Sequence, residues 1–273
     1  MSSIPSRTTP LLPPPPSREE LREHLVANLI AGDVATSRDN NLGNFRRFAE
    51  RDPHYLFGIE PRGRWSADDV LALMAERCGV SPDPARRFGP DRIDPDRTID
   101  ALEAVAARLR KAAEREERVL IATGHPGGLL PVYLELARAL AARGCPVLSP
   151  ASGWVSDGTA NGEVRYISGV GTLSAGGGLR HTHSPEPMRA LLANLERAGE
   201  PPPSLVVADH GWAGAAGQAG ADVLGFADSN DPALFVAEAE GIVSVTVPLD
   251  DNVAPHLYAP LTVYVLQSAE LCY

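Results

Sequence analysis

The sequence predicts an α/β protein in which an N-terminal helical region packs on a mainly parallel, Rossmann-like, three-layer sheet domain. Three observations lead to this fold class. The hydrophobic period changes near Arg118, from helical spacing to short continuous apolar runs. Those runs then alternate with helical stretches, which is typical of a parallel sheet with helices on both faces. Polar residues follow four of the runs, at the strand ends where open α/β folds bind ligands.

The chain divides into three predicted parts. Residues 1–16 lack a sustained apolar core and end in four prolines, so we expect a disordered tail and no signal peptide. Residues 17–117 are expected to form the helical region, and residues 118–273 the α/β catalytic domain. No apolar stretch approaches the roughly 20 residues that a membrane helix needs, so we expect no membrane association.

Capping signals place the helices of the first half. Ser17-Arg-Glu-Glu20 and Ser66-Ala-Asp-Asp69 each resemble the start of a capped helix. Asp94 precedes a proline, as an N-cap before the first helical position does, and predicts a long helix through Leu109. We expect no strand before residue 118.

The second half supplies the predicted sheet. Continuous apolar runs predict buried parallel strands, and a glycine-rich stretch leaves room for a hairpin. The strands are expected at 119–123, 146–149, 205–209, 223–228 and 243–249, with the hairpin around 164–174. Helices are expected at about 130–143 and 184–200, and from 256 or 259 to 269.

Charge and cysteine content narrow the class of protein. The formal net charge of −10 argues against binding to duplex nucleic acid, which needs a basic face, but allows a nucleotide-sized anion in a local pocket. The three cysteines have no metal-ligand spacing, so we expect reduced structural thiols in a cytoplasmic protein. The sequence does not determine the oligomeric state, and a homodimer is the default expectation.

Asp209 and His210 end an apolar run and are the first candidates for catalytic or metal-binding residues. The pair suits metal binding or general acid–base catalysis. The alternative is an aspartate that caps the following turn. Three glycines follow, at 211, 214 and 217, and would let the backbone approach a bound group closely.

Oxygen ligands follow the next two runs. Asp228 and Asn230 are hard ligands that suit Mg²⁺ or Mn²⁺. Asp231 precedes a proline, so helix capping is its expected role. Asp250 and Asp251 are either further ligands or loop caps.

Histidines supply a second set of candidates. His181 and His183 alternate, so in an extended segment they face the same side and could bind a metal or a phosphate. Hydrogen bonding to the loop backbone is the alternative. His125 lies in a strand-to-helix turn whose Gly127 and Gly128 amides could hold an anion, although the turn is not a Walker loop because it lacks the lysine.

Arginines complete the predicted phosphate site. Arg46 lies in an unusually polar helical stretch, and its planar guanidinium suits forked contacts to phosphate. Arg180 precedes the histidine pair and is a second candidate.

Five motifs together resemble a family of actinobacterial proteins called phosphatase. They are Asp33-Val-Ala-Thr-Ser-Arg-Asp-Asn-Asn41, Thr123-Gly-His-Pro-Gly-Gly128, His181-Thr-His-Ser184, Val207-Ala-Asp-His-Gly-Trp-Ala-Gly214 and Gly225-Phe-Ala-Asp-Ser-Asn-Asp-Pro-Ala-Leu234. The resemblance implies phosphomonoester hydrolysis and, for some members, a place in natural-product metabolism, including nucleoside antibiotics. The layout is also similar to that of metal-dependent damage-control phosphatases, in which Asp and Asn metal ligands lie at strand ends.

The leading hypothesis is a metal-dependent phosphatase that acts on a small phosphate monoester such as a nucleotide or sugar phosphate. Asp209, Asp228 and Asn230 would hold one or two divalent ions, with His183 or His210 assisting, and Mg²⁺ or Mn²⁺ is favoured over Fe, Co, Ni or Zn. His125 or His210 would protonate the leaving oxygen. The alternatives are another metal-dependent hydrolase or an isomerase on the same site, and a non-catalytic nucleotide or metabolite sensor.

Overall fold

The central sheet is mainly parallel, as the sequence predicts. The computed structural model describes residues 14–156 and 161–272, and its large sheet has the strand order β4-β5-β3-β7-β8-β9, with β6 paired to β5. The strands that pair in parallel are β3 (Val119–Ala122), β5 (Val170–Ala175), β7 (Leu205–Asp209), β8 (Val223–Ala227) and β9 (Val245–Pro248). The predicted hairpin is confirmed as β4 (Glu163–Ile167) and β5, which pair antiparallel, and β6 (Gly178–Leu179) is also antiparallel to β5.

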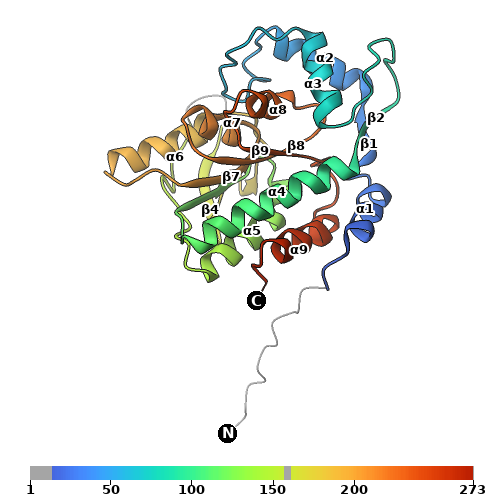
Figure 1. Ribbon diagram of the computed structural model, residues 1–273. Helices are drawn as coiled ribbons and strands as arrows, with labels where there is room; N and C mark the ends of the chain where they lie inside the picture. The colour runs from blue at the N-terminus through green and yellow to red at the C-terminus, as the bar shows by residue number, and fades with distance from the viewer. Residues whose placement is uncertain (1–13, 157–160, 273) are drawn as a thin grey trace.

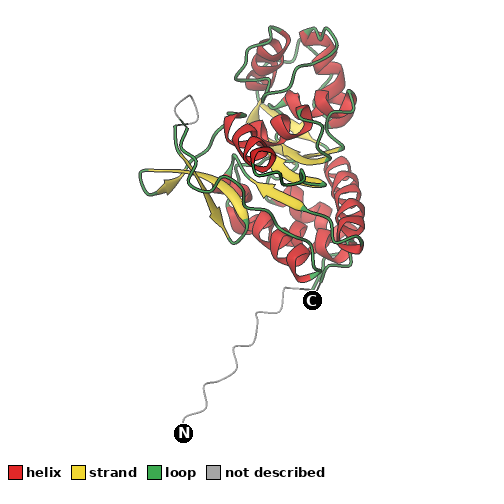
Figure 2. Ribbon diagram, turned by 90° about the vertical axis from the view of Figure 1, so that its left-hand side faces the viewer, coloured by secondary structure: helices red, strands yellow, loops and turns green. Residues whose placement is uncertain are grey.

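Helices cover both faces of this sheet (Figures 1 and 2). One face carries α1 (Arg18–Ala27), α4 (Pro95–Glu114), α5 (Pro126–Ala142) and α9 (Ala259–Ser268), which follows the short 3-10 helix η1 (Pro255–Tyr258). The other face carries α2 (Arg38–Ala49), α3 (Ala67–Arg77), α6 (Glu186–Arg197), α7 (His210–Gln218) and α8 (Pro232–Ala239). The molecule therefore has three layers.

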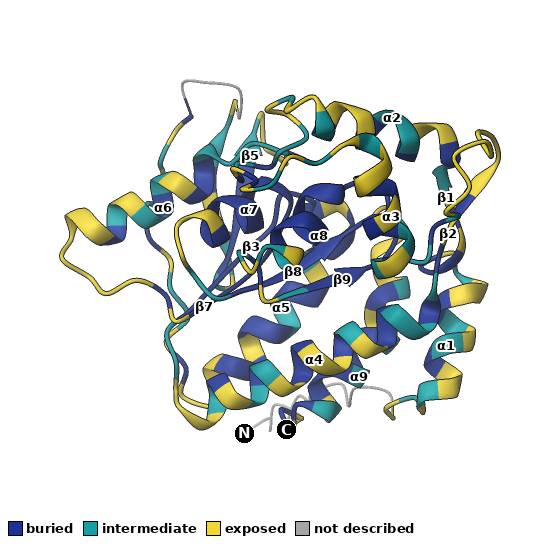
Figure 3. Cartoon of the chain, turned by 45° about the horizontal axis from the view of Figure 1, so that its top comes forward, coloured by how far each residue is buried: buried dark blue, intermediate teal, exposed yellow. Residues whose placement is uncertain are grey.

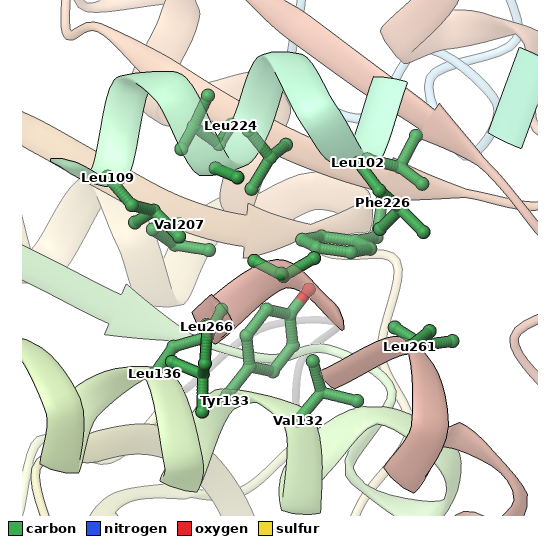
Figure 4. Packing of buried hydrophobic residues seen from close by; sticks show 14 of the residues in the cluster. Leu102, Leu109, Val132, Tyr133, Leu136, Val207, Leu224, Phe226, Leu261 and Leu266 are labelled. Atoms are coloured by element: carbon green, nitrogen blue, oxygen red, sulfur yellow. The ribbon is translucent and has the colours of Figure 1, made fainter. Parts of the chain in front are cut away.

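Alternation along the strands explains why two separate cores form. In β3, Val119 and Ile121 pack into the core below the sheet, and Leu120 and Ala122 into the core above it. Successive strand side chains point to opposite faces, so a strand buried on both sides must be apolar throughout. The central strands are buried, whereas the outer helices alternate buried and exposed positions (Figure 3). Tyr133 packs edge-on against Phe226 in the lower core (Figure 4).

The three helix starts predicted from capping signals in the first half are confirmed. Ser17 and Ser66 form complete capping boxes at the starts of α1 and α3. Asp94 accepts a hydrogen bond from the Asp96 amide and precedes the proline that begins α4. Each cap satisfies backbone donors that the first helical turn leaves free.

Two secondary-structure predictions are wrong. The first half contains a strand pair, β1 (Gly32–Ser37) and β2 (Pro90–Ile93), which lie antiparallel. Residues 146–149 form only one bridge to the main sheet, from Val147 to Val119, because β5 takes the place beside β3 from Ile121 onward.

The tail predicted at residues 1–16 falls mostly outside the described residues, which begin at 14. Within the described part of the chain, no helix is long and apolar enough to cross a membrane. The three cysteines form no disulfide, and Cys78 and Cys145 are buried.

Candidate metal centre and active site

The carboxyl ends of four parallel strands bring the predicted polar residues to one edge of the sheet. His125 follows β3 as the N-cap residue of α5, and Asp209 is the last residue of β7. Asp228 follows β8 directly, and Asp250 and Asp251 follow β9. All five side chains are buried.

Asp209 is fully buried, and both of its carboxylate oxygens accept hydrogen bonds from other residues of the protein. Its Oδ2 accepts a hydrogen bond from the Thr123 hydroxyl at 2.6 Å. Its Oδ1 accepts from the backbone amides of Gly124 at 2.7 Å and His125 at 3.1 Å, and lies 2.9 Å from His210 Nδ1. The carboxylate therefore fixes the β3–α5 turn and the orientation of His210. It forms no side-chain capping bond to α7, although it is the N-cap residue.

His210 links Asp209 to two further carboxylates. With Nδ1 held by Asp209, its Nε2 lies 3.4 Å from Asp231 Oδ2 and 3.6 Å from Asp251 Oδ2. Burial lowers the pKa of His210, but hydrogen bonds to Asp209 and Asp231 outweigh burial and raise it well above the usual value. The backbone of His210 has a φ of +46°, an unfavourable value for a residue with a side chain.

Asp231 has a different role from the one predicted for it. It occupies the N-cap position of α8, but its side chain forms no capping hydrogen bond and faces His210 instead. Its carboxylate thereby becomes part of the cluster.

Three carboxylates crowd together beside His210. One ligand atom each from Asp228, Asp250 and Asp251 lies within 4.8 Å of the others, and all three residues are buried. Burial, followed by repulsion from Asp251 and Asp250, raises the pKa of Asp228 well above its usual value. Among the described residues, no arginine or lysine pairs with these three. Such a group favours a bound cation, because like charges this close are otherwise unfavourable.

Two buried atoms at the centre of the cluster lack hydrogen-bond partners. They are Asp251 Oδ2 and His125 Nδ1, which lie 3.4 Å apart. A buried polar atom without a partner costs roughly 1–3 kcal/mol. Two ligands held about 2.1 Å from one tetrahedral ion lie about 3.4 Å apart, so the spacing fits a shared cation. The donor set therefore fits a divalent metal.

Five of the seven histidines gather around this edge. His183 lies 4.6 Å from His210 and 4.9 Å from His181 between ring centroids, and His181 lies 4.3 Å from His125. His54, from the loop before α3, stacks on His183 at 4.7 Å. Burial and the nearby His210 charge lower the pKa of His181 to about 4 and that of His183 to about 2, so both rings are neutral at pH 7.

A cavity of about 780 Å³ adjoins the histidines. Its lining joins the loop before α3 to the segment before α6 and includes His54, Leu56, His181, His183 and Arg189. The volume lies within the usual range for small-molecule sites. Sequence reasoning missed His54, because nothing in its local sequence marks it.

The glycines of α7 have another role than predicted. A methyl group at Gly211 would lie 2.1 Å from the carbonyl oxygen of His183, and one at Gly214 would lie 2.1 Å from that of Phe57. The space that we expected a bound group to fill is taken by the protein backbone. This close packing places His183 and Phe57 against His210.

The remaining predicted binding residues are more scattered. Gly128 packs against Asp251, whose carbonyl oxygen would lie 2.1 Å from an added methyl group, whereas Gly127 is exposed. Asn230 donates its side-chain amide to Asn40 at 2.9 Å. Arg46 and Arg180 are exposed, with no side-chain hydrogen bond or ion pair to the described residues. Their predicted contacts with phosphate or metal stay predictions.

The protein is therefore an α/β protein whose parallel strands end in buried carboxylates and histidines that could hold a metal ion. The family model described as Phosphatase matches residues 16–273, and the chain belongs to this family. The chain is 54% identical over 262 residues to Phosphatase SCO2771 of Streptomyces coelicolor, covering 95% of this chain and 99% of that protein. Streptomyces is an actinobacterial genus, so the family resemblance found in the motifs is confirmed.

Proposed function

We propose that the protein is a metal-dependent phosphatase that hydrolyses small phosphate monoesters. Family membership and the named relative support a phosphatase. The observation that carries the metal dependence is the buried group Asp228, Asp250 and Asp251 beside the unpartnered nitrogen of His125. A nucleotide or sugar phosphate as substrate, and a place in nucleoside-antibiotic metabolism, stay predictions from the family resemblance.

The residues that would hold the metal lie at the strand ends. They are Asp228, Asp231, Asp250, Asp251, His125 and His210. When bound there, a divalent metal supplies activation of water and neutralisation of phosphoryl charge. This division differs from the sequence-based one, which gave His125 and His210 the acid–base role and included Asp209, Asn230 and His183 as ligands.

Asp209 acts as a positioning residue in this proposal. Its carboxylate oxygens contact Thr123, Gly124, His125 and His210, and the contact with Nδ1 orients the ring of His210. A carboxylate that accepts the second N–H of a ligating histidine fixes the tautomer and raises the basicity of the ligand nitrogen.

The cavity beside the histidines receives the substrate. His183 lines it with a neutral ring, whose N–H can donate a hydrogen bond to a phosphoryl oxygen. Leu56 and Ile59 line the same cavity with apolar surface for the organic part of the ester. Among the described residues, the charged ones of the lining are Arg189, Glu60 and Glu186, so Arg189 is the one cation available there to contact a phosphoryl group.

The test is phosphate release from nucleoside 5′-monophosphates and sugar phosphates by chelator-treated protein. Mg²⁺, Mn²⁺, Fe²⁺, Co²⁺, Ni²⁺ or Zn²⁺ is then added back separately. Release that appears only with metal supports the proposal. Full release by the chelated protein contradicts metal dependence. Absence of release with every metal, together with metal-dependent stabilisation, favours another hydrolase, an isomerase or a sensor.

A further inference from the structure

We propose that this sheet edge holds two divalent cations in adjoining sites of unlike ligand chemistry, bridged by Asp251. The inference deepens the proposed function, because it rests on the same metal-binding residues. It concerns how many ions bind and to which atoms, and these can be measured without any substrate.

The number of cation sites follows from the hydrogen bonding of His210, which leaves one of its two ring nitrogens free to bind a metal. Three overlapping groups could hold an ion: His125, His181 and His210; His210, Asp231 and Asp251; and Asp228, Asp250 and Asp251. His210 occurs in two of them, but its Nδ1 is bonded to Asp209, so only Nε2 is open. One imidazole nitrogen binds one ion, and these two groups therefore describe a single site.

Asp251 differs from His210 in having two oxygens. It occurs both in the group with His210 and Asp231 and in the group with Asp228 and Asp250. Its side chain is 7% exposed, and its Oδ2 has no hydrogen-bond partner although it lies 3.4 Å from His125 Nδ1 and 3.6 Å from His210 Nε2. A carboxylate can give one oxygen to each of two ions, so Asp251 can belong to both sites at once.

The first site combines nitrogen and oxygen ligands. His210 Nε2 lies 3.4 Å from Asp231 Oδ2, and His125, whose side chain is 9% exposed, directs an unpartnered Nδ1 toward Asp251. Imidazole together with carboxylate suits Zn²⁺, Fe²⁺, Co²⁺ or Mn²⁺ better than Mg²⁺.

The second site offers only oxygen. Asp228 is held in place by the Thr36 hydroxyl and by the backbone amide of Ser229, and Asp250 accepts a hydrogen bond from the Asn252 amide at 2.9 Å. Such a set suits Mg²⁺ or Mn²⁺. Mn²⁺ is thus the ion that both sites accept.

The experiment counts Mn²⁺ ions per chain on chelator-treated full-length protein, by calorimetric titration and elemental analysis, and records the electron paramagnetic resonance spectrum. We expect two ions and a spin-coupled pair. In Asp228→Asn and in Asp231→Asn we expect one ion and an uncoupled spectrum. Asp39→Asn, an exposed carboxylate on α2, is the matched control and should keep two ions.

Saturation of the wild type at one ion overturns the proposal, and so does a coupled pair that survives Asp228→Asn. Circular dichroism checks that each variant is folded. If a variant is not folded, the wild-type count and spectrum decide alone. Two bound ions without phosphate release from any ester would contradict the proposed reaction and leave this inference intact.

Discussion

The Oδ1 atom of Asp209 lies 2.9 Å from Nδ1 of His210, and the same oxygen accepts hydrogen bonds from the backbone amides of Gly124 and His125. One buried carboxylate thus joins the end of β7 to the turn after β3. This contact leaves Nε2 of His210 facing Asp231 and Asp251, so the direction of the histidine is set by a residue that does not face the cation site itself.

Asp209→Asn should weaken metal binding by about 10–100-fold, the usual effect of losing a carboxylate behind a ligating histidine. The amide side chain retains the size of the carboxylate but loses the charge that fixes the His210 tautomer. Calorimetric titration with Mn²⁺ measures the affinity. Asp39→Asn, which removes an exposed charge, is the control; equal affinity in both variants would show that Asp209 does not position the ring.

Asp228→Asn should leave the metal-free protein at least as stable as the wild type. Burial, followed by repulsion from Asp251 and Asp250, raises the pKa of Asp228, so the charged form of this side chain is unfavourable and a neutral amide of similar size avoids that cost. Because a ligand stabilises the state that binds it, the rise in melting temperature on adding metal should shrink in this variant. Thermal scans with and without metal measure both effects. A markedly lower melting temperature without metal would contradict this account of the repulsion.

Gly211→Ala should destabilise the fold by about 1–3 kcal/mol or more, as overpacking does. The added methyl group would lie 2.1 Å from the His183 carbonyl oxygen, so the segment that carries His183 must move. We therefore also expect a higher KM. Gly43→Ala is the matched control, because nothing lies within 4 Å of its added methyl group and alanine favours a helix by about 0.5–1 kcal/mol. Denaturant unfolding compares the two; equal stabilities would rule out the close packing.

Glu240 should contribute stability that is lost in acid. Burial raises its pKa, but hydrogen bonds from the Trp65 indole and from the backbone amides of Arg62 and Gly63 lower it below the ordinary value of 4.5. A depressed pKa gives stability that is present above pH 4.5 and declines as the pH falls through the folded-state pKa. The stability difference between wild type and Glu240→Gln should therefore shrink below pH 4.5. A difference that is constant from pH 7 to pH 3.5 would contradict the assignment.

Local sequence was sufficient to predict most helices and the central strands. Capping residues such as Ser17, Ser66 and Asp94 satisfy donors within a few residues, so their signals are short-range. The strand pair β1 and β2 was missed because Gly32 pairs with Ile93, a partner far along the chain. Neither segment has enough apolar side chains to mark a strand by itself.

The sequence alone determined that acidic residues and histidines follow the apolar runs. Because a parallel sheet brings the ends of such runs to one edge, it also predicted that these residues gather there. Only the tertiary structure decided which of their atoms are open. Asp209 and Asp228 follow similar runs, but their surroundings differ. Asp209 is occupied by two backbone amides, a hydroxyl and a histidine. Asp228 accepts hydrogen bonds from Thr36 and Ser229 and also lies beside two other carboxylates. The free atoms of a buried carboxylate depend on what neighbouring segments donate to it, and those segments are distant in the sequence.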